Sequence, residues 1–198
     1  MKKIFFLHGL NWSVACPMAV TLREELRGVA EVVAPDLSVD PEVALAAVRE
    51  ICREVKTDLI VGSSYGSFLG QQVVGEVGCR ALLCSPMFQM AEFLQTRIGW
   101  HEFKSPRRDG AIGYEVTPEL IEKYRRTEVH QFDGYNPAMR DRVIGFYGSQ
   151  DTLARTRQEF LRYYSTVIDY DGPHTMTPEN VRSVLAPAAI RILKSNAI

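Results

Sequence analysis

Short apolar runs alternate with segments of helical periodicity along the whole chain, and this alternation limits the possible folds more than any other feature. The runs occupy residues 4–7, 31–34, 59–61, 81–84, 143–147 and 166–170. Buried strands separated by helices are typical of a parallel sheet with helices on both faces. The sequence therefore predicts an α/β fold whose doubly wound parallel sheet has about six strands, in the spatial order 2-1-3-4-5-6.

The segments between these runs carry two kinds of helix signal. Apolar residues recur every three or four positions and so form one apolar helical face each, at residues 18–29, 44–55 and 181–192. Three helix starts combine a capping side chain with Pro and then Glu, at residues 40–42, 117–119 and 177–179. Pro187 interrupts the last of these helices, and we expect it to kink or restart that helix.

Residues 88–140, between the fourth and fifth strands, form an interval too long for a simple crossover. This interval carries eight basic and eight acidic residues and a predicted helix from Thr117 to about Arg126. We interpret it as a cap-like insert, which covers one end of the sheet within a single domain of residues 1–198. Helical packing without any contact to substrate is the alternative.

Charge and hydropathy exclude several classes of partner. The net charge is −1, which gives no electrostatic footprint for a nucleic acid. No stretch approaches the ~20 apolar residues of a membrane span. The apolar run at the N-terminus stops at His8, short of the roughly 7–15 residues of a signal sequence. Together with four cysteines that form no Cys-x-x-Cys pair, these features predict a cytoplasmic protein with reduced thiols.

The strongest local motif is Gly62-Ser63-Ser64-Tyr65-Gly66, directly after the third run and before a helical pattern at residues 68–77. A strand that turns sharply into a helix can present its central serine above the sheet, and small neighbours prevent a clash there. We therefore predict that Ser64 is a nucleophile. An ordinary turn is the alternative.

A serine nucleophile needs a histidine base within hydrogen-bond distance. In folds of this kind the chain order is Ser, then acid, then His. His8 precedes Ser64, and His101 and His130 lie in the insert. His174, in the loop after the last strand, is therefore the predicted base. A surface histidine is the alternative.

Asp151 follows the fifth strand and is the predicted acid that orients His174. Asp171 is the most plausible substitute, ahead of Asp169 and Asp133. Asp151 is also in position to cap a helix over residues 153–160, and the two roles are compatible.

Two backbone N–H groups are predicted to bind the oxyanion of a tetrahedral intermediate. One belongs to Tyr65, the residue after the nucleophile, and the other to Leu10 in the loop after the first strand. The side-chain amide of Asn11 is an alternative to the Leu10 N–H. We expect His8 to order this loop rather than to exchange protons with a substrate.

Several further residues are candidates for the substrate pocket. An acyl pocket is predicted from Asn11, Trp12, Phe68, Met87 and Phe88, with Phe93 as a further candidate. Core packing explains the apolar residues of this set equally well. A basic stretch in the insert indicates either a solvated surface or contact with an anionic substrate tail, at Lys104, Arg107 and Arg108. No group of residues has the spacing of metal ligands.

The motifs resemble those of the α/β-hydrolase superfamily and, within it, the small YqiA-like esterases. The resemblance rests on residues 6–13 (Phe-Leu-His-Gly-Leu-Asn-Trp-Ser), 62–66, 113–119, Asp151 and 172–174. It implies hydrolysis of a small-molecule carboxylic ester without a cofactor, with Ser64, Asp151 and His174 at the triad positions. The sequence departs from the family pattern at Tyr65, Ser67, residues 84–86 and Arg155, which puts the substrate preference in doubt.

We therefore expect a serine esterase that acts through an acyl-enzyme. A thioesterase, acyltransferase or amidase on the same residues is one alternative. A non-catalytic binding module with this fold is another, because fold alone does not determine function.

Overall fold

A computed structural model describes residues 1–195 and shows a six-stranded, fully parallel sheet. Its spatial order is β2-β1-β3-β4-β7-β8, which confirms the predicted order, because β5 and β6 belong to the insert. The strands are β1 (Lys2–Leu7), β2 (Ala30–Val33), β3 (Leu59–Ser63), β4 (Arg80–Cys84), β7 (Val143–Gly148) and β8 (Thr166–Tyr170). Each lies within one or two residues of its predicted bounds.

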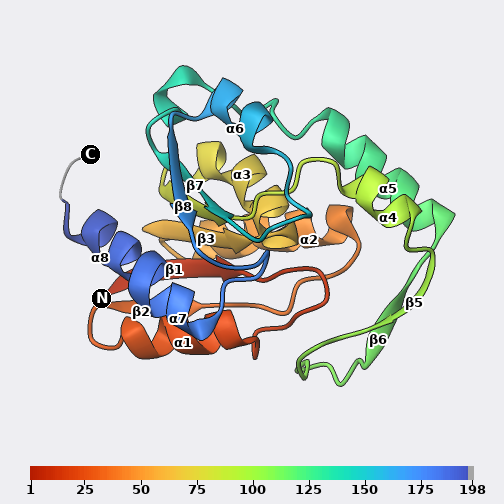
Figure 1. The fold of residues 1–198 in the computed structure, drawn as a ribbon, viewed down its shortest axis with the longest axis horizontal. Coiled ribbons are helices and arrows are strands. Elements are labelled where there is room, and N and C mark those ends of the chain that lie inside the picture. The colour runs from red at the N-terminus through yellow and green to blue at the C-terminus, as the bar shows by residue number, and fades with distance from the viewer. Residues whose placement is uncertain (196–198) are drawn as a thin grey trace.

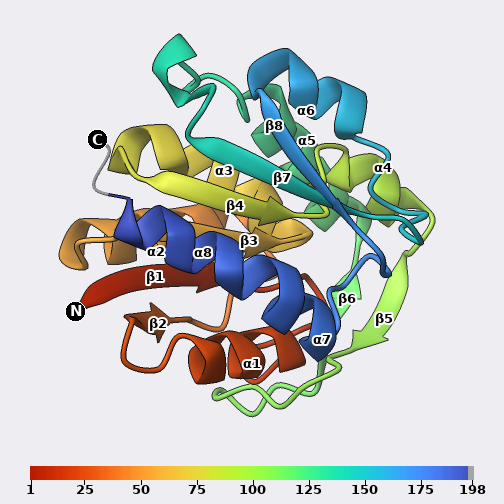
Figure 2. The ribbon, with the colours of Figure 1, turned by 60° about the vertical axis from the view of Figure 1, so that its left-hand side comes forward.

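Helices cover both faces of this sheet, as the alternating sequence pattern predicts. One face is covered by α1 (Pro17–Glu25), α7 (Pro178–Asn180) and α8 (Ala186–Lys194), and the other by α2 (Pro41–Glu54), α3 (Tyr65–Val77) and α6 (Arg157–Tyr163). Figure 2 shows α8 in front of the strands and α3 behind them. Successive side chains of a strand point to opposite faces. Ile4 and Phe6 of β1 therefore pack in one buried cluster, and Phe5 and Leu7 in the other.

The helix starts follow the predicted capping pattern. The Asp40 carboxylate accepts hydrogen bonds from the Glu42 and Val43 N–H groups at the start of α2. Thr177 forms a capping box with Asn180 at the start of α7. Pro187 lies in the first turn of α8, directly after a π-helical segment at Val181–Leu185, so the helix changes from π to α next to this proline while its backbone stays helical.

The insert, residues 88–140, contains α4 (Met90–Gln95), the antiparallel hairpin β5 (Gly99–Glu102) and β6 (Gly113–Val116), α5 (Pro118–Val129) and a short 3-10 helix (Pro137–Met139). The predicted helix is α5, and the Thr117 hydroxyl caps it by accepting from the Leu120 N–H. The hairpin was not predicted, because neither of its strands, Gly-Trp-His-Glu and Gly-Tyr-Glu-Val, is an apolar run. Figure 1 shows α4, α5 and the hairpin on the side of the molecule opposite the N-terminus and the end of α8.

Across residues 1–195, the structure contains no helix that combines the length and the apolar character needed to cross a membrane.

Candidate active site

Ser64 lies in a sharp turn between β3 and α3. Its backbone has φ 53° and ψ −111°, a conformation that non-glycine residues rarely adopt. The Ser64 N–H donates to the Cys84 carbonyl at the end of the neighbouring strand β4 (2.8 Å). A strained serine held in this way between a strand and a helix is what the predicted nucleophile elbow requires.

Both glycines of this motif are required because a larger residue would clash with the backbone. A Cβ atom on Gly66 would lie 1.9 Å from the Leu7 carbonyl oxygen of β1, far inside van der Waals contact. A Cβ atom on Gly62 would lie 2.6 Å from the Gly66 carbonyl oxygen. The close contact of α3 with β1 therefore depends on Gly66, and the tight turn from β3 into α3 depends on Gly62.

The structure brings Ser64, His174 and Asp151 together. His174 Nε2 lies 2.9 Å from Ser64 Oγ, and His174 Nδ1 lies 2.9 Å from each carboxylate oxygen of Asp151. The three side chains follow β3, β8 and β7, whose carboxyl ends meet at one edge of the sheet. Asp171 takes no part in this contact, because its carboxylate accepts from Ser149 Oγ and Gln150 Nε2.

The Asp151 carboxylate is held in its ionised form. Burial by itself raises its pKa. The hydrogen bond and charge of His174, with the N–H groups of Ala154 and Leu153, outweigh burial and lower the pKa to about 2. An ionised Asp151 fixes the ring orientation of His174 and favours a proton on its Nδ1. The helix expected over residues 153–160 begins only at Arg157, so Asp151 caps a turn instead.

Ser85 supports His174 from a second strand end. It follows β4, is fully buried, and also has positive φ (46°). Its hydroxyl donates to the His174 carbonyl (2.7 Å), while its N–H donates to the Phe146 carbonyl of β7 (2.8 Å). The sequence gives no signal for this role except the departure from the family pattern at residues 84–86.

The loop after β1 forms a turn in which the Trp12 N–H donates to the Gly9 carbonyl (3.0 Å). The hydrogen bond of this turn does not use the N–H groups of its two central residues, Leu10 and Asn11. The Tyr65 N–H lies in the first turn of α3, where N–H groups have no partner within the helix. Both predicted oxyanion donors therefore belong to segments next to Ser64.

His8 orders the start of this loop from a buried position. Its Nε2 accepts from the Leu37 N–H (2.9 Å), which leaves the proton on Nδ1, 2.8 Å from the Gly9 carbonyl oxygen. Burial lowers the pKa of His8 to about 4. His8 is therefore neutral near pH 7 and bridges two loops, in the structural role expected for it.

A pocket of about 210 Å³ opens beside Ser64 and His174. Its remaining lining residues are Gly9, Leu10, Asn11, Trp12, Met90, Phe93, Arg97, Lys104, Leu153 and Thr175. Asn11, Trp12 and Phe93, three of the residues predicted for an acyl pocket, thus line a pocket beside Ser64.

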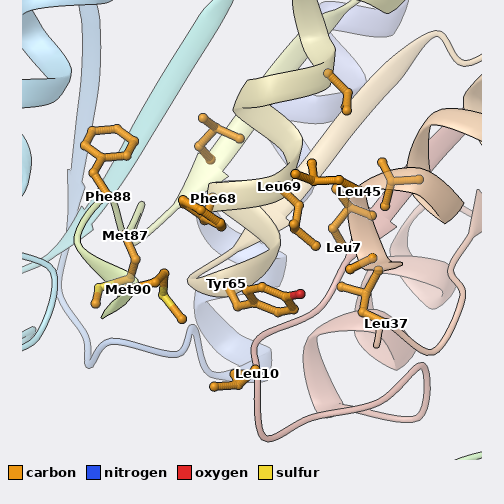
Figure 3. Close-up of a cluster of buried hydrophobic side chains, with 14 of the residues drawn as sticks. Leu7, Leu10, Leu37, Leu45, Tyr65, Phe68, Leu69, Met87, Phe88 and Met90 are labelled. Carbon is orange, nitrogen blue, oxygen red and sulfur yellow. The ribbon is translucent and has the colours of Figure 1, made fainter. Parts of the chain in front are cut away.

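Three predicted pocket residues lie elsewhere. Phe68, Met87 and Phe88 are at most 5% exposed and belong to the core cluster between the sheet and the helices α2 and α3. Figure 3 shows Phe68 on α3 near Tyr65, with Met87 and Phe88 in the segment after β4. Phe88 stacks on Phe160 of α6, so its ring fills the interior. The prediction that these three residues line the pocket is wrong, because their side chains pack in the core.

The insert supplies part of the pocket wall, and two of its lining residues, Met90 and Arg97, were not predicted from the sequence. Met90, Phe93, Arg97 and Lys104 all come from it. Its hairpin also contacts the loop after β1, where the Lys104 N–H donates to the Asn11 carbonyl (2.7 Å) and the Tyr114 hydroxyl donates to Asn11 Oδ1 (2.6 Å).

The described residues contain no group of side chains that could bind a metal ion. Within residues 1–195, no three His, Cys, Asp or Glu side chains are grouped as metal ligands. The four cysteines are free thiols. His101 contacts the Arg97 carbonyl and His130 pairs with Asp133, so neither histidine of the insert reaches Ser64.

Solved structures with the same fold include several hydrolases. Alpha/beta hydrolase domain-containing protein 10 from mouse has a TM-score of 0.70 at 13% identity, covering 98% of this chain and 90% of that chain. Est1E from Butyrivibrio proteoclasticus has a TM-score of 0.67 at 14% identity, covering 97% and 88%. The thioesterase domain from the curacin biosynthetic pathway has a TM-score of 0.57 at 13% identity, covering 97% and 90%. At these identities the similarity shows the fold.

Sequence comparison gives the family directly. No curated protein sequence matches the chain significantly. A family model for alpha/beta hydrolases matches residues 4–193, nearly the whole chain. With the parallel sheet described above, this match identifies the chain as a member of the alpha/beta hydrolase family.

Proposed function

We propose that this protein is a serine hydrolase that cleaves carboxylic esters through Ser64, His174 and Asp151. The observation that carries the proposal is the continuous chain of contacts from Asp151 through His174 to Ser64 Oγ, each 2.9 Å long. Membership in the alpha/beta hydrolase family supports hydrolase activity.

In the first half-reaction, Ser64 Oγ attacks the ester carbonyl carbon while His174 Nε2 takes the hydroxyl proton. Asp151 stays ionised and stabilises the imidazolium that forms on His174. The N–H groups of Tyr65 and Leu10 stabilise the oxyanion. The bond from the carbonyl carbon to the alkoxy oxygen then breaks, and His174 donates its proton to the departing alcohol.

In the second half-reaction, His174 Nε2 takes a proton from water, whose oxygen attacks the acyl carbon on Ser64. Collapse of this second tetrahedral intermediate breaks the bond to Ser64 Oγ, which regains its proton from His174. The carboxylic acid leaves, and the enzyme returns to its starting state without any other reactant. In this proposal the insert forms the wall that holds the substrate beside Ser64.

Labelling with a fluorophosphonate probe, followed by mass-spectrometric mapping of the adduct, tests the proposal without a choice of substrate. We expect one adduct, on Ser64, that is absent in Ser64→Ala and strongly reduced in His174→Ala. Ser149→Ala, which removes an exposed serine of the loop after β7, is the matched control and should label like the wild type.

An adduct elsewhere, or none on folded protein, would contradict the proposal and favour a binding module. Where Ser64 is labelled, matched ester, thioester and amide substrates separate the esterase from the alternative acyl-transfer activities.

A further inference from the structure

The pocket beside Ser64 is positively charged. Among its lining residues are two basic side chains, Arg97 and Lys104, and no Asp or Glu. Both come from the insert, on the wall that also contains Phe93. A substrate with a negative charge would therefore find two cations in the same pocket as the proposed nucleophile.

Neither cation is neutralised by an ion pair with another of the described residues, 1–195. Four of the six other basic side chains of the insert are paired, in the ion pairs Arg107–Asp109, Lys123–Asp40, Arg125–Glu122 and Arg126–Glu42. The basic residues Lys104 and Arg107, close in sequence, therefore differ in their contacts. The Arg107 side chain is only 7% exposed and bonded to Asp109 and the Leu37 carbonyl, whereas the Lys104 ammonium lies over the ring of Trp12, which lines the pocket.

Arg97 is held in place without losing its charge. Its Nη1 donates to the Phe93 carbonyl (2.8 Å) and to Thr96 Oγ1 (3.0 Å), and its guanidinium lies 3.9 Å from the centre of the Phe93 ring. These contacts engage Nη1 and one face of the group. A guanidinium carries five N–H donors, so Nε and Nη2 remain for a carboxylate or phosphate.

Lys104 is fixed through its backbone and lies over Trp12. Its N–H donates to the Asn11 carbonyl (2.7 Å), and its ammonium is 5.6 Å from the centre of the Trp12 ring. Asn11 and Trp12 line the same pocket. The Lys104 ammonium is exposed, so we expect it to bind an anion more weakly than the half-buried Arg97.

We propose that Arg97 and Lys104 form an anion subsite, and that the substrate is a small ester with a second, negatively charged group, a carboxylate or a phosphate. This inference rests on the proposed function for the position of the scissile bond. The pocket volume of about 210 Å³ is below the roughly 300–1,000 Å³ of pockets for drug-sized ligands, which favours a short substrate.

Two matched pairs of esters test the subsite and separate the possible positions of the charge. An acyl-side anion is probed with mono-para-nitrophenyl adipate against its neutral methyl ester. An alcohol-side anion is probed with para-acetoxybenzoate against its methyl ester. We expect wild-type kcat/KM to be about tenfold higher for the anionic member of at least one pair.

Substitutions then show which side chain causes the preference for anionic esters. Arg97→Gln should reduce the ratio of anionic to neutral kcat/KM by about tenfold or more, and Lys104→Gln by about threefold. Arg125→Gln, which removes an exposed cation of α5 outside the pocket lining, is the matched control and should leave the ratio unchanged. Calorimetry with adipate and para-hydroxybenzoate on the Ser64→Ala protein should show binding that weakens when Arg97→Gln is added.

The outcomes distinguish the two proposals. Ser64-dependent hydrolysis without a charge preference, with no Arg97-dependent binding in calorimetry, overturns the subsite and leaves the esterase standing. Hydrolysis of none of the four esters, or activity that survives in Ser64→Ala, counts against the esterase. Calorimetry then still decides the subsite, because anion binding needs no catalysis.

Discussion

The carboxyl edge of the sheet and the insert contribute to the same pocket by different physical means. At the sheet edge, Ser64, Asp151 and His174 are placed by strand ends, a strained turn and glycines that permit contact between backbones. In the insert, Arg97 and Lys104 come from a short hairpin and its flanking turn. Their side chains lie over the Phe93 and Trp12 rings, and a backbone hydrogen bond to Asn11 also holds Lys104.

This difference indicates a division of roles. Backbone geometry tolerates little change, so the sheet edge suits the groups of a reaction that needs atoms placed within fractions of an ångström. Side chains on a peripheral hairpin can be exchanged without disturbing the sheet, so the insert suits the selection of a substrate. The predictions that follow test the sheet edge first and the contact between the two regions last.

Asp151→Asn should have the largest effect, a loss of about 10⁴-fold in kcat for ester hydrolysis. An amide at this position can donate to His174 Nδ1 and so favours the wrong tautomer of the ring. Steady-state kinetics with a neutral para-nitrophenyl ester measures the loss. Asp171→Asn, which changes an exposed carboxylate bonded to Ser149 and Gln150, is the control and should retain near-normal kcat. The reverse result would move the acid to Asp171.

Gly66→Ala should destabilise the fold by about 4 kcal/mol or more, because the new methyl group overlaps the Leu7 carbonyl. Urea denaturation followed by circular dichroism measures the free energy of unfolding. Gly78→Ala is the matched control at the other end of α3. Its φ is +71° and no atom lies within 4 Å of the new Cβ, so we expect a cost of about 1–2 kcal/mol. Equal costs at the two positions would show that backbone contact at the elbow is not what requires glycine.

His8 should make the sheet edge sensitive to acid. Its pKa is about 4 in the folded protein and about 6.5 in the unfolded chain, so the unfolded chain binds the extra proton between these values. The free energy of unfolding should therefore fall by about 3 kcal/mol from pH 6.5 to pH 4 and lose nothing more from this group below that.

Denaturant unfolding across this pH range is the measurement, with His8→Asn as the non-titrating comparison. The variant should show a flatter pH dependence than the wild type between pH 6.5 and pH 4. Asp151, with its pKa lowered to about 2, loses its contribution only as the pH falls below about 4, so the two windows are separate. Parallel curves for the two proteins would exclude His8 as the cause.

Tyr114→Phe should have the smallest effect, because it removes one hydrogen bond between the insert and the loop after β1. We expect a loss of about 1 kcal/mol of stability and about a fivefold decrease in kcat/KM as Asn11 loses its orientation. Tyr124→Phe removes a similar bond, from α5 to the Val39 carbonyl, without touching the pocket lining. It should cost similar stability and leave kcat/KM unchanged. A comparable kinetic loss in both variants would show a general loosening of the insert.

The sheet order, the capped helix starts and the position of the elbow were predictable from the sequence. The strands, the helix starts and the elbow each depend on a local requirement, namely an apolar run, a capping side chain followed by proline, or glycine beside a strained serine. The sheet order follows from the right-handed crossovers that connect parallel strands. The proximity of Ser64, Asp151 and His174 was predictable for a related reason. Parallel strands place their carboxyl ends at one edge, so residues that follow neighbouring strands meet there.

The pocket wall was predictable only in part. The sequence cannot show whether an aromatic residue such as Phe88 lines a cavity or packs in the core. Its stacking on Phe160 in the structure places it in the core. The same is true of Lys104 and Arg107, three positions apart, of which one lines the pocket and the other pairs with Asp109.

By itself the sequence determined the fold, the strained serine and the order of the residues proposed for catalysis. The tertiary structure decided the hairpin of the insert, the support of His174 by Ser85 and the charge of the pocket. The physical reason is the range of the interactions. Strand formation and helix capping follow from neighbours in sequence, whereas the contacts of Tyr114 with Asn11 and of Ser85 with His174 join residues about a hundred positions apart.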